Sequence, residues 1–230
     1  MMKYLVSIII LIAFACTTKP KDKPTKFPTA ADVKTALKDM LRSAQVYRAQ
    51  IPAVRQKYNG LKSLEEEGLW KKQAAVDSMN MDKIEDIIAH YGYPGKALVG
   101  DSLKTIAASV ILQNPKRQAP YVGLIWKAAK AGDIPKSDAA FLEDRVLMFS
   151  GKKQKYGTSM KFDTVSLDPN TKFAVTKLRV WPIERPEKVD SLRFTIGLYP
   201  LMRQCEIMNI DVSTIQGYKF NAAAPLIQSK

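Results

Sequence analysis

The sequence has one histidine and two cysteines in 230 residues, and its longest apolar run is too short to cross a bilayer. So few Cys and His side chains exclude metal sites built from several such ligands, and also a disulfide-stabilised scaffold. We therefore expect no metal ion, and no motif implies a cofactor. Hydrophobic residues form 46 % of the chain, which excludes global disorder and allows one domain with a sizeable core.

Residues 1–15 are predicted to be a signal peptide. Lys3 precedes an apolar run over residues 4–12, which fits a signal-peptide h-region. Cys16 follows directly after Ala13-Phe14-Ala15 and resembles the cysteine of a bacterial lipobox, with Ala13 where Leu is usual. This resemblance implies cleavage before Cys16, a thioether-linked lipid on its sulfur and acylation of its amine. The alternative is an ordinary signal peptide with an incidental cysteine.

The lipoprotein resemblance also implies a location. A lipidated Cys16 anchors the chain to a membrane of the bacterial cell envelope, and Thr17 in place of Asp is the pattern of outer-membrane sorting, with either a periplasmic or a surface-facing domain. Residues 16–28 are predicted to be a tether, because residues 17–28 hold four Lys and three Pro but no aliphatic side chain. The tether is a solvated spacer or contacts anionic lipid headgroups.

The basic surplus, a net charge of +14, does not form a single block. Residues 17–60 hold ten Lys and Arg against three acidic residues, whereas residues 61–100 hold five against seven. Nucleic-acid binding needs a focused basic patch, so we expect no nucleic-acid partner. A charge gradient beside an anchored N-terminus favours contact with anionic lipid or cell-wall polymer.

Residues 29–218 are predicted to form a single, mainly α-helical domain, followed by a poorly ordered tail over 219–230. Apolar residues recur every three or four positions over 29–58, which indicates a helix kinked at Pro52. Two segments that are apolar on most sides are expected to be buried central helices. The predicted helices after residue 58 are 61–75, 80–90, 103–113 (central), 119–130 and 139–149 (central).

The C-terminal third contains the only predicted strands. Residues 160–166 and 173–180 are rich in Val, Thr and Phe, and Asp168-Pro169-Asn170 lies between them, which predicts a small antiparallel β-hairpin. A short helix is expected on each side of Pro200. Cys205 lies in an apolar-rich stretch, and we expect its thiol to be buried.

Several short blocks resemble a bacterial domain family of unknown function over about residues 33–205. The family patterns are H-G-W-P-G, S-L-V-G, Q-H-A-D, D-R-V and Y-G-T-Q, and the similar segments here begin at His90, Ala97, Gln113, Asp144 and Tyr156. The resemblance implies a shared fold, leaves a shared site open and indicates no reaction. Where the family has Trp, a second His and Gln, this chain has Tyr93, Asn114 and Ser159, so a mechanism that needs two histidines is excluded.

Asp144 and Arg145 are the most informative candidates for a site. Each lies among apolar residues on a helical wheel, so each needs a partner to offset its desolvation. They are about 100° apart on the helix, so we expect them to bond to different groups. The expected partners are the loop that carries Gln154 and Tyr156 and the loop over residues 93–100. Such a network either holds these loops in place or lines a pocket.

Three further residues have two interpretations each. His90, at a predicted helix C-terminus, is a general acid or base beside Asp144, or a residue that caps the helix. Gln113, at the end of a buried helix, binds a ligand or ties down a loop. Tyr93, held extended by Pro94, lines a pocket or packs over the helix end.

These observations favour a binding or interaction module. Its ligand, a small molecule or a glycan, would contact Tyr93, Gln113, Arg145, Gln154 and Tyr156. The first alternative is a hydrolase that uses His90 and Asp144 as acid–base groups, although the chain has no G-x-S-x-G nucleophile motif. The second alternative is a structural envelope protein in which the same residues only stabilise loops.

Overall fold

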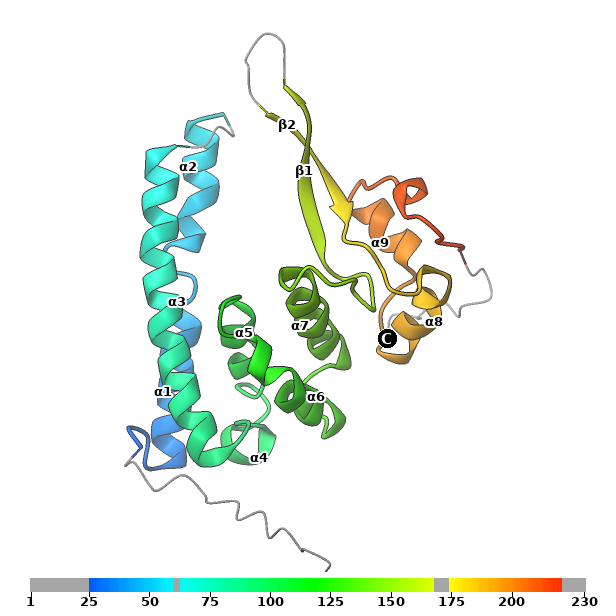
Figure 1. Ribbon diagram of the computed structural model, residues 1–230. Coiled ribbons are helices and arrows are strands. Elements are labelled where there is room, and N and C mark those ends of the chain that lie inside the picture. The colour runs from blue at the N-terminus through cyan, green and yellow to red at the C-terminus, as the bar shows by residue number, and fades with distance from the viewer. Residues whose placement is uncertain (1–24, 60–62, 168–173, 221–230) are drawn as a thin grey trace, which may run out of the picture.

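The computed structural model describes residues 25–59, 63–167 and 174–220, and these form a mainly helical structure with one two-stranded antiparallel sheet (Figure 1). The predicted fold class is therefore confirmed. The predicted signal peptide, Cys16 and most of the predicted tether lie outside the described residues, as do the last ten residues of the chain.

The N-terminal segment is not the single kinked helix that its periodicity predicts. Helix α1 (Ala30–Ser43) begins with a capping box between Thr29 and Asp32, and α2 (Ile51–Lys57) follows a short 3₁₀ segment. Pro52 is not at a kink but in the first turn of α2, where its missing N–H is harmless. The break occurs earlier, where the backbone N–H groups of Tyr47 and Arg48 donate to the side chain of Gln73.

Helix α3 (Leu64–Tyr91) is one continuous helix where two were predicted, and it runs the full height of the helical layer (Figure 1). Ser63 caps its N-terminus by accepting from the N–H of Glu66. Gly68 lies in the second turn and is tolerated there, because a helix of this length packed against neighbours offsets the cost of one glycine, about 1 kcal/mol. Gly92, with φ of 70°, ends the helix.

The middle of the chain forms α4 (Lys96–Val99), α5 (Ile106–Leu112), α6 (Val122–Lys130) and α7 (Lys136–Phe149). Helix α5 is buried as predicted. Helix α7 is not apolar on every side: Ala139, Ala140 and Leu142 are buried, but Phe141 and Phe149 are exposed. The prediction for α7 was wrong because its exposed aromatic residues were assigned to the core.

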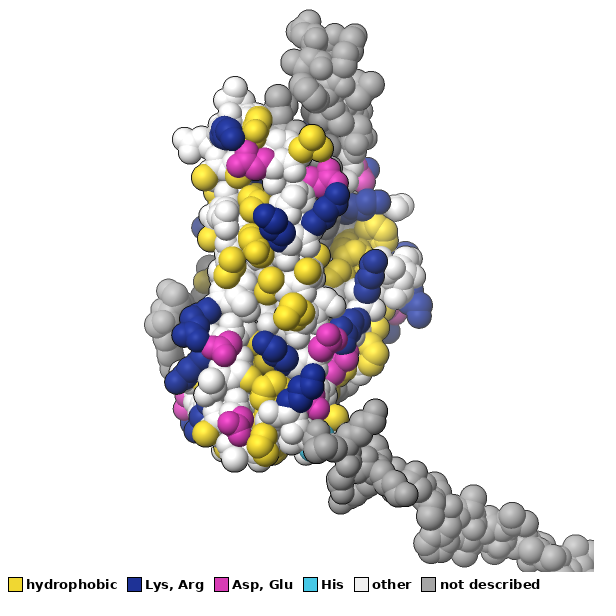
Figure 2. All heavy atoms as spheres, turned by 90° about the vertical axis from the view of Figure 1, so that its left-hand side faces the viewer, with side chains coloured by type: hydrophobic (Ala, Val, Ile, Leu, Met, Phe, Trp, Pro, Cys, Tyr) yellow, Lys and Arg dark blue, Asp and Glu magenta, His cyan; other side chains and the backbone are white. Residues whose placement is uncertain are grey.

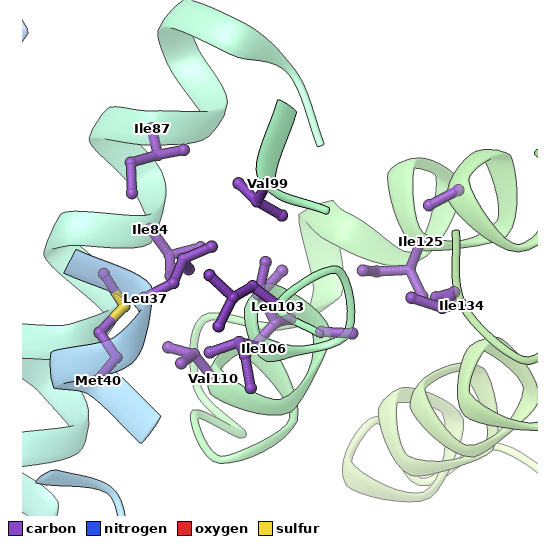
Figure 3. Packing of buried hydrophobic residues seen from close by; sticks show 14 of the residues in the cluster. Leu37, Met40, Ile84, Ile87, Val99, Leu103, Ile106, Val110, Ile125 and Ile134 are labelled. Carbon is purple, nitrogen blue, oxygen red and sulfur yellow. The ribbon is translucent and has the colours of Figure 1, made fainter. Parts of the chain in front are cut away.

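The main hydrophobic core lies between α1, α3, α5 and α6, as Figure 3 shows. Leu37 and Met40 of α1 lie close to Ile84 of α3, and Val110 of α5 lies beside them. Burial of each such side chain contributes about 1.5–3 kcal/mol. Ile125 of α6 extends the same core away from α3.

The C-terminal third has a second, smaller core. Strands β1 (Met160–Leu167) and β2 (Ala174–Val180) pair antiparallel, as predicted, while the predicted turn between them lies outside the described residues. Helices α8 (Val189–Thr195) and α9 (Leu201–Ile207) are the two expected short helices. The buried residues of this core include Cys205, which is 1 % exposed, so its predicted burial is confirmed.

Candidate functional site

The sequence-predicted site residues lie in three separate places. Asp144, Gln154 and Tyr156 belong to a buried network that joins α7 to the segment after it. His90 lies in the last turn of α3 and Tyr93 follows that helix in the chain, and the C-terminal end of α3 lies beside α4 (Figure 1). Gln113 and Arg145 line an open cleft. We consider the three places in turn.

Asp144 is fully buried. Its carboxylate accepts hydrogen bonds from four donors of one loop, three backbone N–H groups and one side-chain hydroxyl. Oδ1 accepts from the N–H of Lys155 at 2.7 Å, and Oδ2 accepts from the N–H and hydroxyl of Thr158 at 3.0 and 2.8 Å. The N–H of Tyr156 lies 3.1 Å from both oxygens. Burial raises the pKa of Asp144, and these hydrogen bonds oppose that effect. The carboxylate holds the loop closed and has no open side toward a substrate.

Gln154 closes the same loop from within. Its side chain accepts from the N–H of Ser159 at 2.8 Å and donates to the carbonyls of Ser159 and Trp181. Gln154 is 0 % exposed, so its amide is fully used in tying the loop to the end of β2. The Tyr156 ring packs against Trp126, with ring centroids 6.1 Å apart. Of the two interpretations, these contacts fit a network that holds loops.

Arg193 is a central member of this network that the sequence analysis missed. It is 1 % exposed, although it lies on the short α8 in a chain rich in surface arginines. Its Nη1 donates to the carbonyl of Tyr156 at 2.8 Å, its Nε donates to the carbonyl of Tyr199 at 2.7 Å, and its Nη2 donates to Gln204. Arg193 thus fastens the loop held by Asp144 to the C-terminal core. No local pattern around Arg193 distinguishes it from an exposed arginine.

His90 and Tyr93 are separated from this network. His90 is exposed, and its Nδ1 lies 3.2 Å from the carbonyl oxygen of Asp86 one turn earlier, a contact within α3. The Tyr93 hydroxyl donates to the carbonyl of Lys104, and burial raises the pKa of that hydroxyl. None of the hydrogen-bond partners of Asp144 is His90. The two groups proposed for acid–base chemistry therefore do not form a pair.

An open cleft of about 790 Å³ lies between α3, α5 and α7. We call it the Arg145 cleft. Trp70, Ala74 and Leu112 supply apolar walls, and Gln113 and Arg145 are the two sequence-predicted residues that line it. The remaining lining side chains are mostly polar: Arg48, Asp77, Ser78, Ser109, Asn114, Lys116 and Arg117, together with Pro115.

Two of the arginines of the Arg145 cleft are paired with carboxylates. Arg48 donates to both carboxylate oxygens of Asp77, and its Nη1 also lies 3.3 Å from Oε1 of Gln113. Arg117 pairs with Glu85 and Asp82. These ion pairs fix the walls of the cleft and leave Arg48 and Arg117 little capacity for a further anion.

Arg145 differs from Arg48 and Arg117 because it forms no ion pair with a carboxylate among the described residues. Its Nε is buried, and no hydrogen-bond partner for it occurs among the residues that the structure describes. Its guanidinium lies over the Phe149 ring, 5.6 Å from the centroid, and burial lowers its pKa. Stacking covers one face of the guanidinium but leaves the in-plane N–H donors unused.

Comparison with known proteins gives a family match over most of the chain. Residues 31–214 match a family described as a family of unknown function, DUF6624. The chain belongs to that family. This agrees with the resemblance to a family of unknown function that the sequence motifs suggested, without testing the individual motifs. No curated protein and no solved structure matches the chain. Membership of DUF6624 therefore brings no activity or ligand to the Arg145 cleft.

The described residues of this DUF6624 member contain neither a cluster of metal ligands nor a helix suited to span a membrane. No group of three or more His, Cys, Asp or Glu side chains in the described ranges could hold a metal ion. No helix within those ranges has both the length and the apolar character of a membrane span. On the face formed by α1–α3, Figure 2 shows basic and acidic side chains intermixed with apolar ones.

Proposed function

We propose that this chain is a lipid-anchored protein of the bacterial cell envelope whose helical domain binds a small ligand in the Arg145 cleft. The anchor is Cys16, behind a signal peptide, and the Lys- and Pro-rich tether separates it from the folded domain. The domain faces the periplasm or the cell surface from the outer membrane. Support for this location is the lipobox-like segment that ends at Cys16 and the residue Thr17 after it.

The observation that carries the binding proposal is Arg145. A half-buried guanidinium whose Nε has no hydrogen-bond partner among the described residues costs free energy, because a desolvated charge needs a partner. Polar groups left unsatisfied at an open cleft are typical of binding sites, where stability is given up for function. Gln113, whose Oε1 is oriented by Arg48, lies in the same cleft.

The geometry gives the hydrolase alternative no comparable support, since Asp144 is enclosed by its loop and His90 lies elsewhere. The structural alternative describes Asp144, Gln154 and Arg193 well. It does not account for an open cleft lined by a cation that has no carboxylate partner among the described residues. We therefore assign the structural role to the loop network and the binding role to the Arg145 cleft.

Ala74→Trp is expected to abolish ligand binding, because a large side chain placed on the α3 wall fills the cleft. Ala75→Trp is the matched control, since Ala75 is also exposed on α3 but does not line the cleft. In a thermal-shift screen of organic acids and glycan fragments, a ligand at 100 times its Kd stabilises the chain by about 2.7 kcal/mol. We expect Ala75→Trp to keep this shift and Ala74→Trp to lose it. Equal shifts in both variants, or no shift with any compound, would refute the proposal.

A further inference from the structure

The Arg145 cleft carries more positive than negative charge. Its lining includes four cationic side chains, Arg48, Lys116, Arg117 and Arg145, against one carboxylate, that of Asp77. Two carboxylates outside the lining, those of Glu85 and Asp82, pair with Arg117, which leaves a smaller positive surplus on Lys116 and Arg145. Asp77 is engaged by other groups, because its Oδ1 accepts from Arg48 and Gln73 and its Oδ2 accepts from Arg48, and among the described residues it forms no ion pair with Arg145. The carboxylate inside the cleft therefore does not neutralise Arg145.

The acidic residues next to Arg145 on α7 are also engaged elsewhere. Glu143 accepts from the Trp126 indole at 2.9 Å and pairs with Lys155 at 2.6 Å. Asp144 is enclosed by the loop that it holds. Arg145 thus lines the cleft as a cation with no carboxylate partner among the described residues, and its buried Nε has no hydrogen-bond partner there.

The cleft lining also includes apolar surface from α3 and α5. Trp70 is 42 % exposed, and its indole Nε1 donates to Glu66 at 3.1 Å, which fixes the orientation of the ring. Leu112 of α5 is a second apolar lining residue. A guanidinium and an indole on the same cleft suit a ligand with a charged end and an apolar body.

We propose that the cleft binds a small organic anion whose carboxylate or phosphate group pairs with Arg145 while its apolar part packs against Trp70 and Leu112. This inference rests on the proposed function and names the class of ligand. The guanidinium binds either oxyanion through two parallel N–H donors. Gln113 and Lys116 are placed on the same lining to contribute further donors.

The test titrates the full-length chain with benzoate, phenyl phosphate and the neutral analogue benzamide, and it follows the indole N–H signal of Trp70 by NMR. We expect both anions to shift the signal and benzamide to leave it unchanged. Arg145→Gln should weaken binding of the anions at least about tenfold. Arg42→Gln removes the same charge from an exposed position on α1 and should leave binding unchanged. The ratio of the affinities for benzoate and phenyl phosphate distinguishes a carboxylate ligand from a phosphate ligand.

Two results would overturn the inference. One of them leaves the proposed function standing, and the other overturns the proposed function too. If benzamide binds as tightly as benzoate and Arg145→Gln binds like the wild type, the cleft binds ligands without using the charge. The proposed function then stands and the anion inference fails. If no probe shifts the Trp70 signal and the thermal-shift screen also finds no ligand that Ala74→Trp excludes, the proposed function fails as well.

Discussion

Asp144→Ala is expected to lower the free energy of unfolding by about 3–5 kcal/mol, because it leaves several buried donors without an acceptor. The donors are the N–H groups of Lys155, Tyr156 and Thr158 and the hydroxyl of Thr158. The loop they belong to also presents the Tyr156 carbonyl to Arg193, so its release weakens the junction with the C-terminal core. Urea unfolding followed by circular dichroism measures the loss.

Asp138→Ala is the matched control on the same helix. Asp138 is half-buried, and burial raises the pKa of its carboxyl. The ionised carboxylate of Asp138 therefore contributes little to the free energy of unfolding. We expect a change within about 1 kcal/mol. If Asp144→Ala does not fold at all, Asp144→Asn, which keeps one acceptor oxygen, should fold with a smaller loss. A loss no larger for Asp144→Ala than for Asp138→Ala would contradict the role given to Asp144.

Cys16→Ser is expected to move the chain from the membrane fraction to the soluble fraction of the cell envelope. Without the thiol no thioether lipid can form, and a hydrophilic tether gives no other stable attachment, because stable anchoring needs more than one acyl chain. Fractionation of cells followed by immunoblotting measures the distribution, and mass spectrometry of the wild type should show the acyl groups on an N-terminal peptide that begins at Cys16.

Cys205→Ser is the control for the cysteine substitution. Cys205 is buried in the C-terminal core and cannot carry a lipid in the folded chain, so this variant should stay with the membrane. Retention of Cys16→Ser in the membrane fraction, or release of Cys205→Ser, would contradict the anchor assignment.

The features that could be predicted from the sequence are those set by local patterns. Apolar spacing located most helices, and Val-, Thr- and Phe-rich segments located the hairpin. The apolar context of Cys205 was enough to predict its burial.

The features that were missed depend on contacts between distant residues. The break before α2 is stabilised by Gln73, which lies 25 and 26 residues from the groups it bonds. The burial of Arg193 depends on carbonyls of Tyr156 and Tyr199 that α8 meets only in the folded chain. The grouping of the site residues failed for the same reason, since short motifs do not show which helix faces which.

Asp144 and Arg145 are adjacent, yet the partner of Asp144 was predicted from the sequence and the surroundings of Arg145 were not. The sequence predicted that they would bond to different groups, and the loop carrying Gln154 and Tyr156 is indeed the partner of Asp144. Both were expected to be buried with a partner. Arg145 instead faces an open cleft with its Nε unbonded, and only the packing of α3, α5 and α7 creates that cleft.

The free energy of unfolding of Arg145→Met, measured in urea beside the wild type, decides whether Arg145 serves the cleft or the fold. Methionine keeps much of the side-chain volume and removes the desolvated charge. We predict no loss of stability and a gain of up to about 1 kcal/mol, because no intramolecular ion pair is broken. A loss of about 2 kcal/mol or more would show that Arg145 holds the fold together, and would contradict its assignment as the ligand-binding residue of this protein.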